Sequence, residues 1–168
     1  MVTWGLDTYG QVSGAPAGPG FAQAAGGGSH SIALHNDGHL VAWGADDSGQ
    51  VSNAPPGFGF TQVAAGTSHS SALRSDGSVE AWGSDLAGTV SSAPTNTGFT
   101  QIAAGQSFSM ALDGNGTIHS WGEDYPYDLV TDTPSGYQAR AISTTFRNLV
   151  EIALARYRYS GIRASSAI

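Results

Sequence analysis

The sequence predicts an all-β fold, a partial β-propeller of about three and a half four-stranded blades followed by a C-terminal helix. Three observations support this prediction. A Trp-Gly pair recurs every 39 residues, at Trp4, Trp43, Trp82 and Trp121. Residues 4–42 and 43–81 are identical at 23 of 39 positions, which indicates duplication. Each unit also contains short apolar runs separated by turn signals, and four short strands in such a length are typical of a propeller blade.

Each unit contains a hairpin signal followed by two further strand signals. Asp37-Gly38, Asp76-Gly77 and Asn115-Gly116 predict two-residue turns of type I′, because Asn, Asp and Gly tolerate a positive φ angle. In the first unit the turn joins SHSIALH to HLVAWG. After each Trp-Gly pair, a run such as GQVSGAP predicts a third strand that ends at a proline. A run such as FAQAAGG predicts a fourth, and Met1–Trp4 with GQVSGAP would supply the last two strands of an incomplete blade.

Composition and charge divide the chain near residue 136. Residues 1–136 hold the repeats, as units 4–42, 43–81 and 82–120 and a degenerate fourth unit from 121. Twelve of the 13 acidic residues lie before residue 140, where Arg74 is the only basic residue apart from histidines. Residues 137–168 form a basic tail that holds the other five arginines. An acidic body repels phosphate backbones, so we expect no nucleic-acid partner.

The apolar spacing in the tail predicts a helix over residues 144–158. Its apolar stripe is a candidate assembly surface that would cover an unpaired blade or a second chain. The alternative is an eroded blade that still forms strands or is disordered. The residues proposed for this surface are Phe146, Leu149, Val150, Leu154 and Tyr157.

The repeat motif resembles a known family. The pattern G-x-S-H-S-x-A-L-x-x-D-G-x-V-x-A-W-G-x-D-x-x-G-Q-V is similar to the regulator-of-chromosome-condensation repeat, and the even 39-residue form is most similar to short bacterial versions such as the propeller-type β-lactamase inhibitors. The resemblance implies a propeller that serves as a protein-binding platform. Family propellers typically have seven blades, and 168 residues are too few for that number. An open arc exposes strand edges, which favours association.

Several classes of chemistry lack support in the sequence. No cysteine is present, and neither a signal peptide nor a membrane-spanning run is predicted, so no compartment is assigned. No nucleophile elbow or phosphate loop is visible, and we therefore expect no enzyme activity, cofactor, metal site or membrane partner. His30 and His69 share one repeat position, where they are expected to form hydrogen bonds between blades. His35 and His39 are interpreted as exposed hairpin residues.

Positions that vary on a constant repeat scaffold are where specificity is expected. Two variable loops stand out, one after each Trp-Gly pair and one after each Ala-Gly strand. The acids three residues after each tryptophan, such as Asp46, are instead constant and are expected to cap loop N–H groups. The candidate partner-binding residues are Tyr9, Asp47, Ser48, Thr67, Gln106, Tyr125 and Tyr127.

The sequence therefore favours a non-catalytic protein-binding or scaffold module, and a second copy of the chain is one candidate partner. Two alternatives remain at this point. The loop face could inhibit an enzyme or an exchange factor, or the chain could be a fragment with no independent function.

Overall fold

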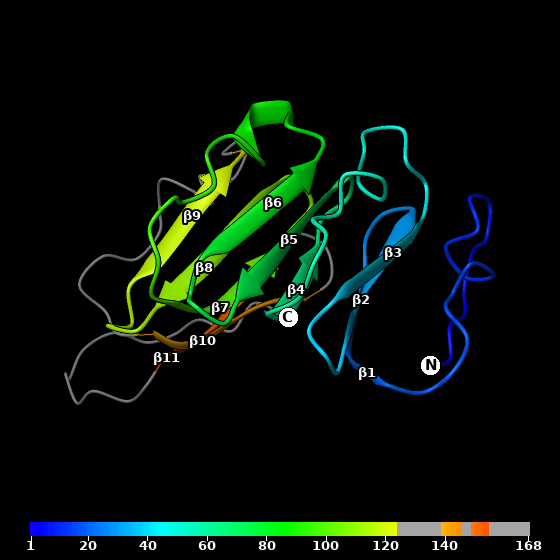
Figure 1. Cartoon of the computed structure of the whole chain (residues 1–168). Helices are drawn as coiled ribbons and strands as arrows, with labels where there is room; N and C mark the ends of the chain where they lie inside the picture. The colour runs from blue at the N-terminus through cyan, green and yellow to red at the C-terminus, as the bar shows by residue number, and fades with distance from the viewer. Residues whose placement is uncertain (124–138, 146–148, 155–168) are drawn as a thin grey trace.

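Three successive sheets with the same topology form the main body of the protein. They are seen in a computed structural model that describes residues 1–123, 139–145 and 149–154. Each sheet is antiparallel and takes its three strands in chain order (Figure 1). The strands are β1 (Phe21–Gly26), β2 (His30–His35) and β3 (Leu40–Gly44) in the first sheet, β4 (Phe60–Ala65), β5 (His69–Arg74) and β6 (Val79–Gly83) in the second, and β7 (Phe99–Ala104), β8 (Phe108–Asp113) and β9 (Ile118–Gly122) in the third.

The predicted hairpins are confirmed, but their turns differ from the predicted type. Leu34 pairs with Leu40, and the turn is closed by hydrogen bonds from His35 N to His39 O and from Gly38 N to His35 O, each 2.9 Å long. Gly38 has a φ angle of 89°, whereas Asp37 is not at positive φ. The connection is therefore a three-residue loop, a turn followed by one left-handed glycine, and only the glycine carries the unusual conformation.

The sheets stack face to face as consecutive blades, with the first strand of each against the first strand of the next. Ile32 and Leu34 of the first sheet pack with Phe60 and Val63 of the second. Leu73 packs with Phe99 and Ile102 in the next layer. Both faces of an inner sheet are thus covered, which explains why its strands do not alternate between apolar and charged residues.

The prediction of a further strand after each Trp-Gly pair is wrong. The segments that begin GQVSGAP, GQVSNAP and GTVSSAP form loops of consecutive turns, and the short 3-10 helix η1 (Leu86–Gly88) leads into the third. Asp7 Oδ1 accepts hydrogen bonds from Val12 N at 2.8 Å and Ser13 N at 3.0 Å. The carboxylate accepts from the backbone N–H groups that would otherwise pair with a neighbouring strand. Each described blade therefore has three strands, and residues 1–20 form no strand.

The predicted C-terminal helix is also wrong over residues 144–145 and 149–154, the part of it that the structure describes. The structure has two strands here, β10 (Ala139–Thr145) and β11 (Leu149–Leu154), which form an antiparallel hairpin. Five residues of these two strands are β-branched and favour strands, namely Ile142, Thr144, Thr145, Val150 and Ile152. The helical interpretation counted the apolar spacing within the tail and took no account of pairing with a second strand or of packing against β7.

The β10–β11 hairpin follows the pattern of the earlier sheets. Its register shifts between Ala139 and Ala141, as the first pair shifts between Phe21 and Gln23. β10 also lies against β7, as β7 lies against β4. The hairpin therefore begins a fourth blade in the stack. No helix in the described residues is long and apolar enough to cross a membrane.

Candidate interaction surfaces

Buried histidine–serine pairs join adjacent blades. His30 Nε2 lies 2.9 Å from Ser70 Oγ of the second blade, and His69 Nε2 lies 2.8 Å from Ser109 Oγ of the third. Each histidine is exposed by no more than 2%. Burial lowers the pKa of His30, and burial together with the charge of His30 lowers the pKa of His69 to about 4. The pairs are neutral and closed to solvent, so they serve as contacts between blades, as the shared repeat position predicted.

A glutamine forms the second contact between blades. The Gln23 side chain donates to Val63 O at 3.1 Å and accepts from Val63 N at 2.9 Å. In the next interface Gln62 Oε1 accepts from Ile102 N at 2.8 Å. One side chain thus satisfies backbone groups on the edge of the following blade, and the edge strand is closed to other chains.

The tryptophans anchor each loop to the sheet that follows it. The indole N–H of Trp43 donates to Gln11 O at 2.9 Å, and that of Trp82 donates to Gln50 O at 3.0 Å. Both rings are less than 8% exposed. The loop that was predicted as a strand therefore covers the outer strand of the next blade without pairing with it.

The structure brings the described candidate loop residues to one end of the blades. The loop after the first strand of a sheet is hydrogen-bonded to the segment after Trp-Gly, with Ala45 N donating to Ser29 O at 2.8 Å. Neighbouring loops are joined by Thr67 N, which donates to Gln106 O at 3.0 Å. Of the candidates, Tyr9, Asp47, Ser48, Thr67 and Gln106 are exposed at this end. Tyr125 and Tyr127 lie outside the described residues.

The predicted assembly surface in the tail has no helix over residues 149–154 to support it. Leu149, Val150 and Leu154 belong to β11, whereas Phe146 and Tyr157 lie outside the described residues.

Asp46 is expected to stabilise its loop, and its neighbour Asp47 provides a control. Asp46 Oδ1 accepts from Val51 N and Ser52 N, both at 2.9 Å, and these hydrogen bonds, Ser52 first, lower the pKa of Asp46. Asp46→Ala should lower the melting temperature by roughly 2–4 °C, as the loss of a cap does in other proteins. Asp47→Ala should change it by less than about 1 °C, because Asp47 is exposed and makes no hydrogen bond in the described structure. Thermal unfolding followed by circular dichroism measures both, and equal shifts would contradict the capping role.

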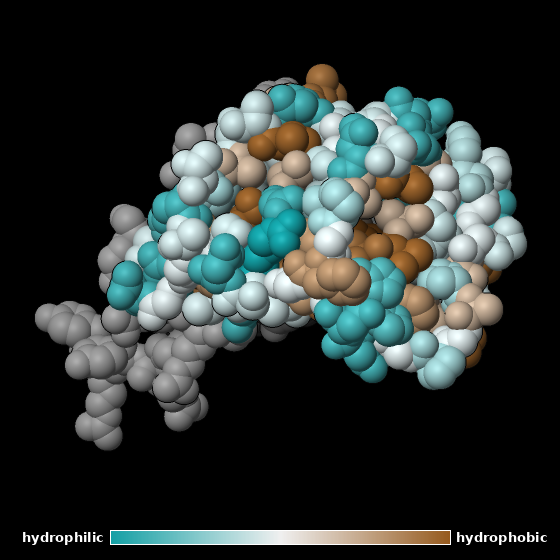
Figure 2. Space-filling view, viewed as in Figure 1, coloured by the Kyte–Doolittle hydropathy of each residue, from teal (hydrophilic) through white to brown (hydrophobic). Residues whose placement is uncertain are grey.

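The face of the first blade that points away from the second blade is uncovered. Val63 and Ile102 have backbone groups that are hydrogen-bonded to a glutamine side chain of the preceding blade, and each residue is 2% exposed. Ala24 occupies the same repeat position in the first blade and is exposed. Large apolar side chains beside it are also exposed, among them Val2 at 81%, Trp4 at 83% and Leu6 at 77%. Figure 2 shows apolar side chains coming to the surface over the first sheet.

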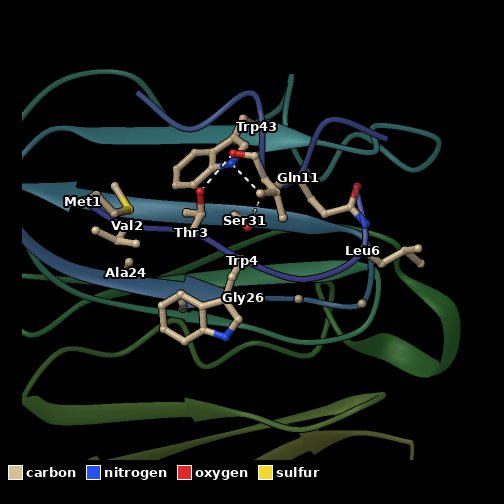
Figure 3. Close-up of a pocket in the computed structure, with 14 residues that line it drawn as sticks. Met1, Val2, Thr3, Trp4, Leu6, Gln11, Ala24, Gly26, Ser31 and Trp43 are labelled. Carbon is tan, nitrogen blue, oxygen red and sulfur yellow. Dashed lines mark hydrogen bonds between the residues drawn. The ribbon is translucent and has the colours of Figure 1, made fainter. Parts of the chain in front are cut away.

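A cavity of about 450 Å³ lies on this uncovered face. Figure 3 shows Met1, Val2 and Trp4 along one side, with Ala24 and Gly26 of β1 among the residues that line it. The wall near Trp43 is polar, because Gln11 O accepts from the Trp43 indole and from Ser31 Oγ at 3.2 Å. Ser31 occupies the position of Ser70 and Ser109, which are hydrogen-bonded to histidines of the preceding blade. The cavity therefore lies where a preceding blade would pack.

The stacked sheets and the contacts between them define a propeller-repeat protein. A sequence model of the family described as "Regulator of chromosome condensation (RCC1) repeat" matches residues 21–50 and 99–125. These two segments of the chain therefore match the RCC1 repeat. No curated protein matches the sequence significantly. The resemblance to short bacterial β-lactamase inhibitors remains an expectation from the sequence.

Solved structures with this arrangement of blades share the fold. The ectodomain of the receptor kinase CR4 from Physcomitrella patens has a TM-score of 0.62 at 25% identity, covering 74% of this chain and 33% of its own. Prp20p from Saccharomyces cerevisiae has a TM-score of 0.58 at 18% identity, covering 74% and 41%. Human WBSCR16 has a TM-score of 0.57 at 18% identity, covering 73% and 42%. The chain thus spans less than half the length of each of these proteins.

Proposed function

We propose that the protein is a non-catalytic protein-interaction or scaffold module, and that its partner packs on the uncovered face of the first blade. The observation that carries the proposal is the exposure of Ala24, at a repeat position that is 2% exposed in both following blades. Exposed apolar surface next to unpaired strand edges favours association with another protein.

The chemistry of this face favours another propeller blade as the occupant. A blade packs on the equivalent face of the second and third sheets, where Val63 and Ile102 are buried. We propose a second copy of this chain as the partner, packed so that the same apolar face of each copy, with Val2, Trp4 and Leu6, covers that of the other. The contact would be apolar, because His30 and His69 already bind the next blade of their own chain.

The relatives support an interaction role in general terms. Prp20p is described through its binding to Gsp1p and histones, and yeast RCC1 has been crystallised bound to Kap60. Their partners are proteins. The exposed loop end of this chain, with Tyr9, Asp47, Ser48, Thr67 and Gln106, is a second surface on which a different partner could be selected.

Self-association should depend on Ala24 and not on Ala22. Both alanines are exposed on β1, but the position of Ala22 is also exposed in the other blades, at Thr61 and Thr100. Ala24→Asp places a charge in the proposed interface and should raise the dissociation constant for self-association by at least about tenfold, since a buried unpaired charge is costly. Ala22→Asp should leave this constant unchanged.

Sedimentation velocity over a range of concentrations measures this association. An unaltered chain that stays monomeric at every concentration would contradict self-association. Association that Ala24→Asp and Ala22→Asp weaken equally would place the interface elsewhere.

A further inference from the structure

The turn between β2 and β3 brings two histidines and one carboxylate to the same point. His35 Nδ1 lies 2.9 Å from Asp37 Oδ1, and His39 Nδ1 lies 2.6 Å from the same oxygen. The three ligand atoms all lie within 4.8 Å of one another. The two imidazole rings are tilted by 30° with centroids 4.6 Å apart. The side chains are partly exposed, so the cluster is open to solutes.

The fold holds this cluster in place before any ligand arrives. His35 and His39 face each other across the hairpin, and the Asp37 carboxylate is fixed by a hydrogen bond from His39 N at 3.1 Å. The His35 ring stands with its plane at 86° to that of Phe21. Gly20 leaves space for it, because a Cβ atom there would lie 2.4 Å from His35 Nε2. Little conformational freedom is left to lose on binding.

The other repeats share the turn but not the ligands. In the second unit Arg74 and Ser78 replace the two histidines, and Asp76 Oδ1 accepts from Ser78 N and Oγ at 2.9 and 2.6 Å. The first two units therefore share this aspartate, whereas the third unit has Asn115 at the same position. In contrast, the histidines on both sides of it belong to the first unit alone, so the fold of the turn does not require them.

We propose that His35, Asp37 and His39 form a binding site for a divalent transition-metal ion of the zinc type. Zinc accepts imidazole nitrogen and carboxylate oxygen at about 2.0–2.2 Å, and ligands of a tetrahedral ion are then roughly 3.3 Å apart. The nitrogen–oxygen separations of 2.6 and 2.9 Å require only a small opening of the cluster. Two imidazoles disfavour Ca²⁺ and Mg²⁺, which prefer oxygen.

The site would provide three protein ligands and leave the fourth position of a tetrahedral ion free. It lies at the turn end of the blade, opposite the end where β3 runs into the loop that follows Trp43. That free position could be filled by water or by a ligand from a second protein. The assignment does not depend on self-association at Ala24, because none of the three residues lines the cavity there.

Isothermal titration of the full chain with zinc chloride at pH 7.5, in a buffer that does not chelate metals, tests the proposal. We expect one equivalent of Zn²⁺ to bind, with no binding of Mg²⁺ or Ca²⁺. His35→Gln, His39→Gln and Asp37→Asn should each weaken Zn²⁺ binding by at least about tenfold. His39→Gln keeps the backbone hydrogen bond to Asp37, so it removes a ligand while leaving the turn closed.

Two matched variants separate this site from general binding to surface residues. Asp76→Asn changes the equivalent aspartate in a turn without histidines, and His119→Gln removes a histidine that lies 3.4 Å from Asp113. Neither substitution should alter the affinity of the chain for Zn²⁺ or the number of Zn²⁺ ions that it binds. Absence of Zn²⁺ binding, or binding that His39→Gln and Asp37→Asn leave intact in folded protein, would overturn the proposal. A loss of binding in His119→Gln equal to that in His39→Gln would overturn it as well.

Discussion

Replacing Trp82 with alanine is expected to lower the free energy of unfolding by about 3–5 kcal/mol, the usual cost of removing a buried aromatic side chain. The ring is 5% exposed and packs in the cluster that contains Ile32, Phe60 and Val63. Its indole N–H also donates a hydrogen bond to Gln50 O, and the substitution would remove this donor. Urea unfolding followed by circular dichroism measures the loss.

Trp4 is the matched control, because it occupies the same repeat position and is 83% exposed. Trp4→Ala should change the free energy of unfolding by less than about 0.5 kcal/mol when measured on the monomer. Two losses of similar size in a monomeric chain would contradict the exposed position of Trp4. If the loss appears only at concentrations where the chain associates, Trp4 becomes buried in the assembly.

Acidification from pH 7.5 to pH 4 is expected to lower the free energy of unfolding by about 3 kcal/mol through His69 alone. Its pKa in the folded chain is about 4, against 6.5 in the unfolded chain, because the buried ring is held neutral. The unfolded state therefore binds the proton first as the pH falls. The contribution of His69 to stability is complete above pH 6.5, declines between pH 6.5 and about 4, and then levels off.

His69→Phe removes this titration and introduces the residue that the third repeat carries, Phe108. The variant should lose less stability than the unaltered chain between pH 7.5 and 4, although His30, whose pKa is also lowered, still contributes. His119→Gln changes a partly exposed ring and should keep the full loss. Urea unfolding at both pH values provides the comparison. An unchanged pH dependence in His69→Phe would refute the role of the buried histidine.

The local signals in the sequence predicted the period, the hairpins and the loop caps of the repeat correctly, but not its number of strands. The 39-residue period, the Asp-Gly hairpins and the capping aspartates are each encoded within a few residues, and the structure confirms them. His30 and His69 were also expected to form hydrogen bonds between blades because they recur at one position, although their serine partners were not predicted. A repeat unit that packs on its own copies leaves few alternatives for the arrangement of its strands.

The two failed predictions have different causes. GQVSGAP has the composition of a strand, but the nearby Asp7 binds the N–H groups of Val12 and Ser13. This cause is local, and it was missed because the cap and the strand were predicted together although both need the same N–H groups. The tail has a helical spacing of apolar residues, but pairing of β10 with β11 and packing against β7 override it. In the tail a partner distant in the chain, β7, contributes to the structure.

The candidate surfaces were foreseen only in part. The sequence placed variable residues in two loops, and the structure shows that these loops share one end of the blades. The sequence did not indicate the cavity at Ala24, because burial at a repeat position depends on whether another blade packs against it. His35 and His39 were dismissed since they lack counterparts in the other repeats. Their spacing across a three-residue turn places them directly opposite each other, and this spacing was the signal for the proposed metal site.

The glutamine and histidine contacts between blades all join residues 40 positions apart, as His30 joins Ser70 and Gln23 joins Val63. Adding or deleting one whole 39-residue unit would therefore recreate the same junction and require no compensating substitution elsewhere. Unequal recombination that adds or removes whole units therefore keeps the partners of each contact in register, and blade number becomes a variable on which selection can act.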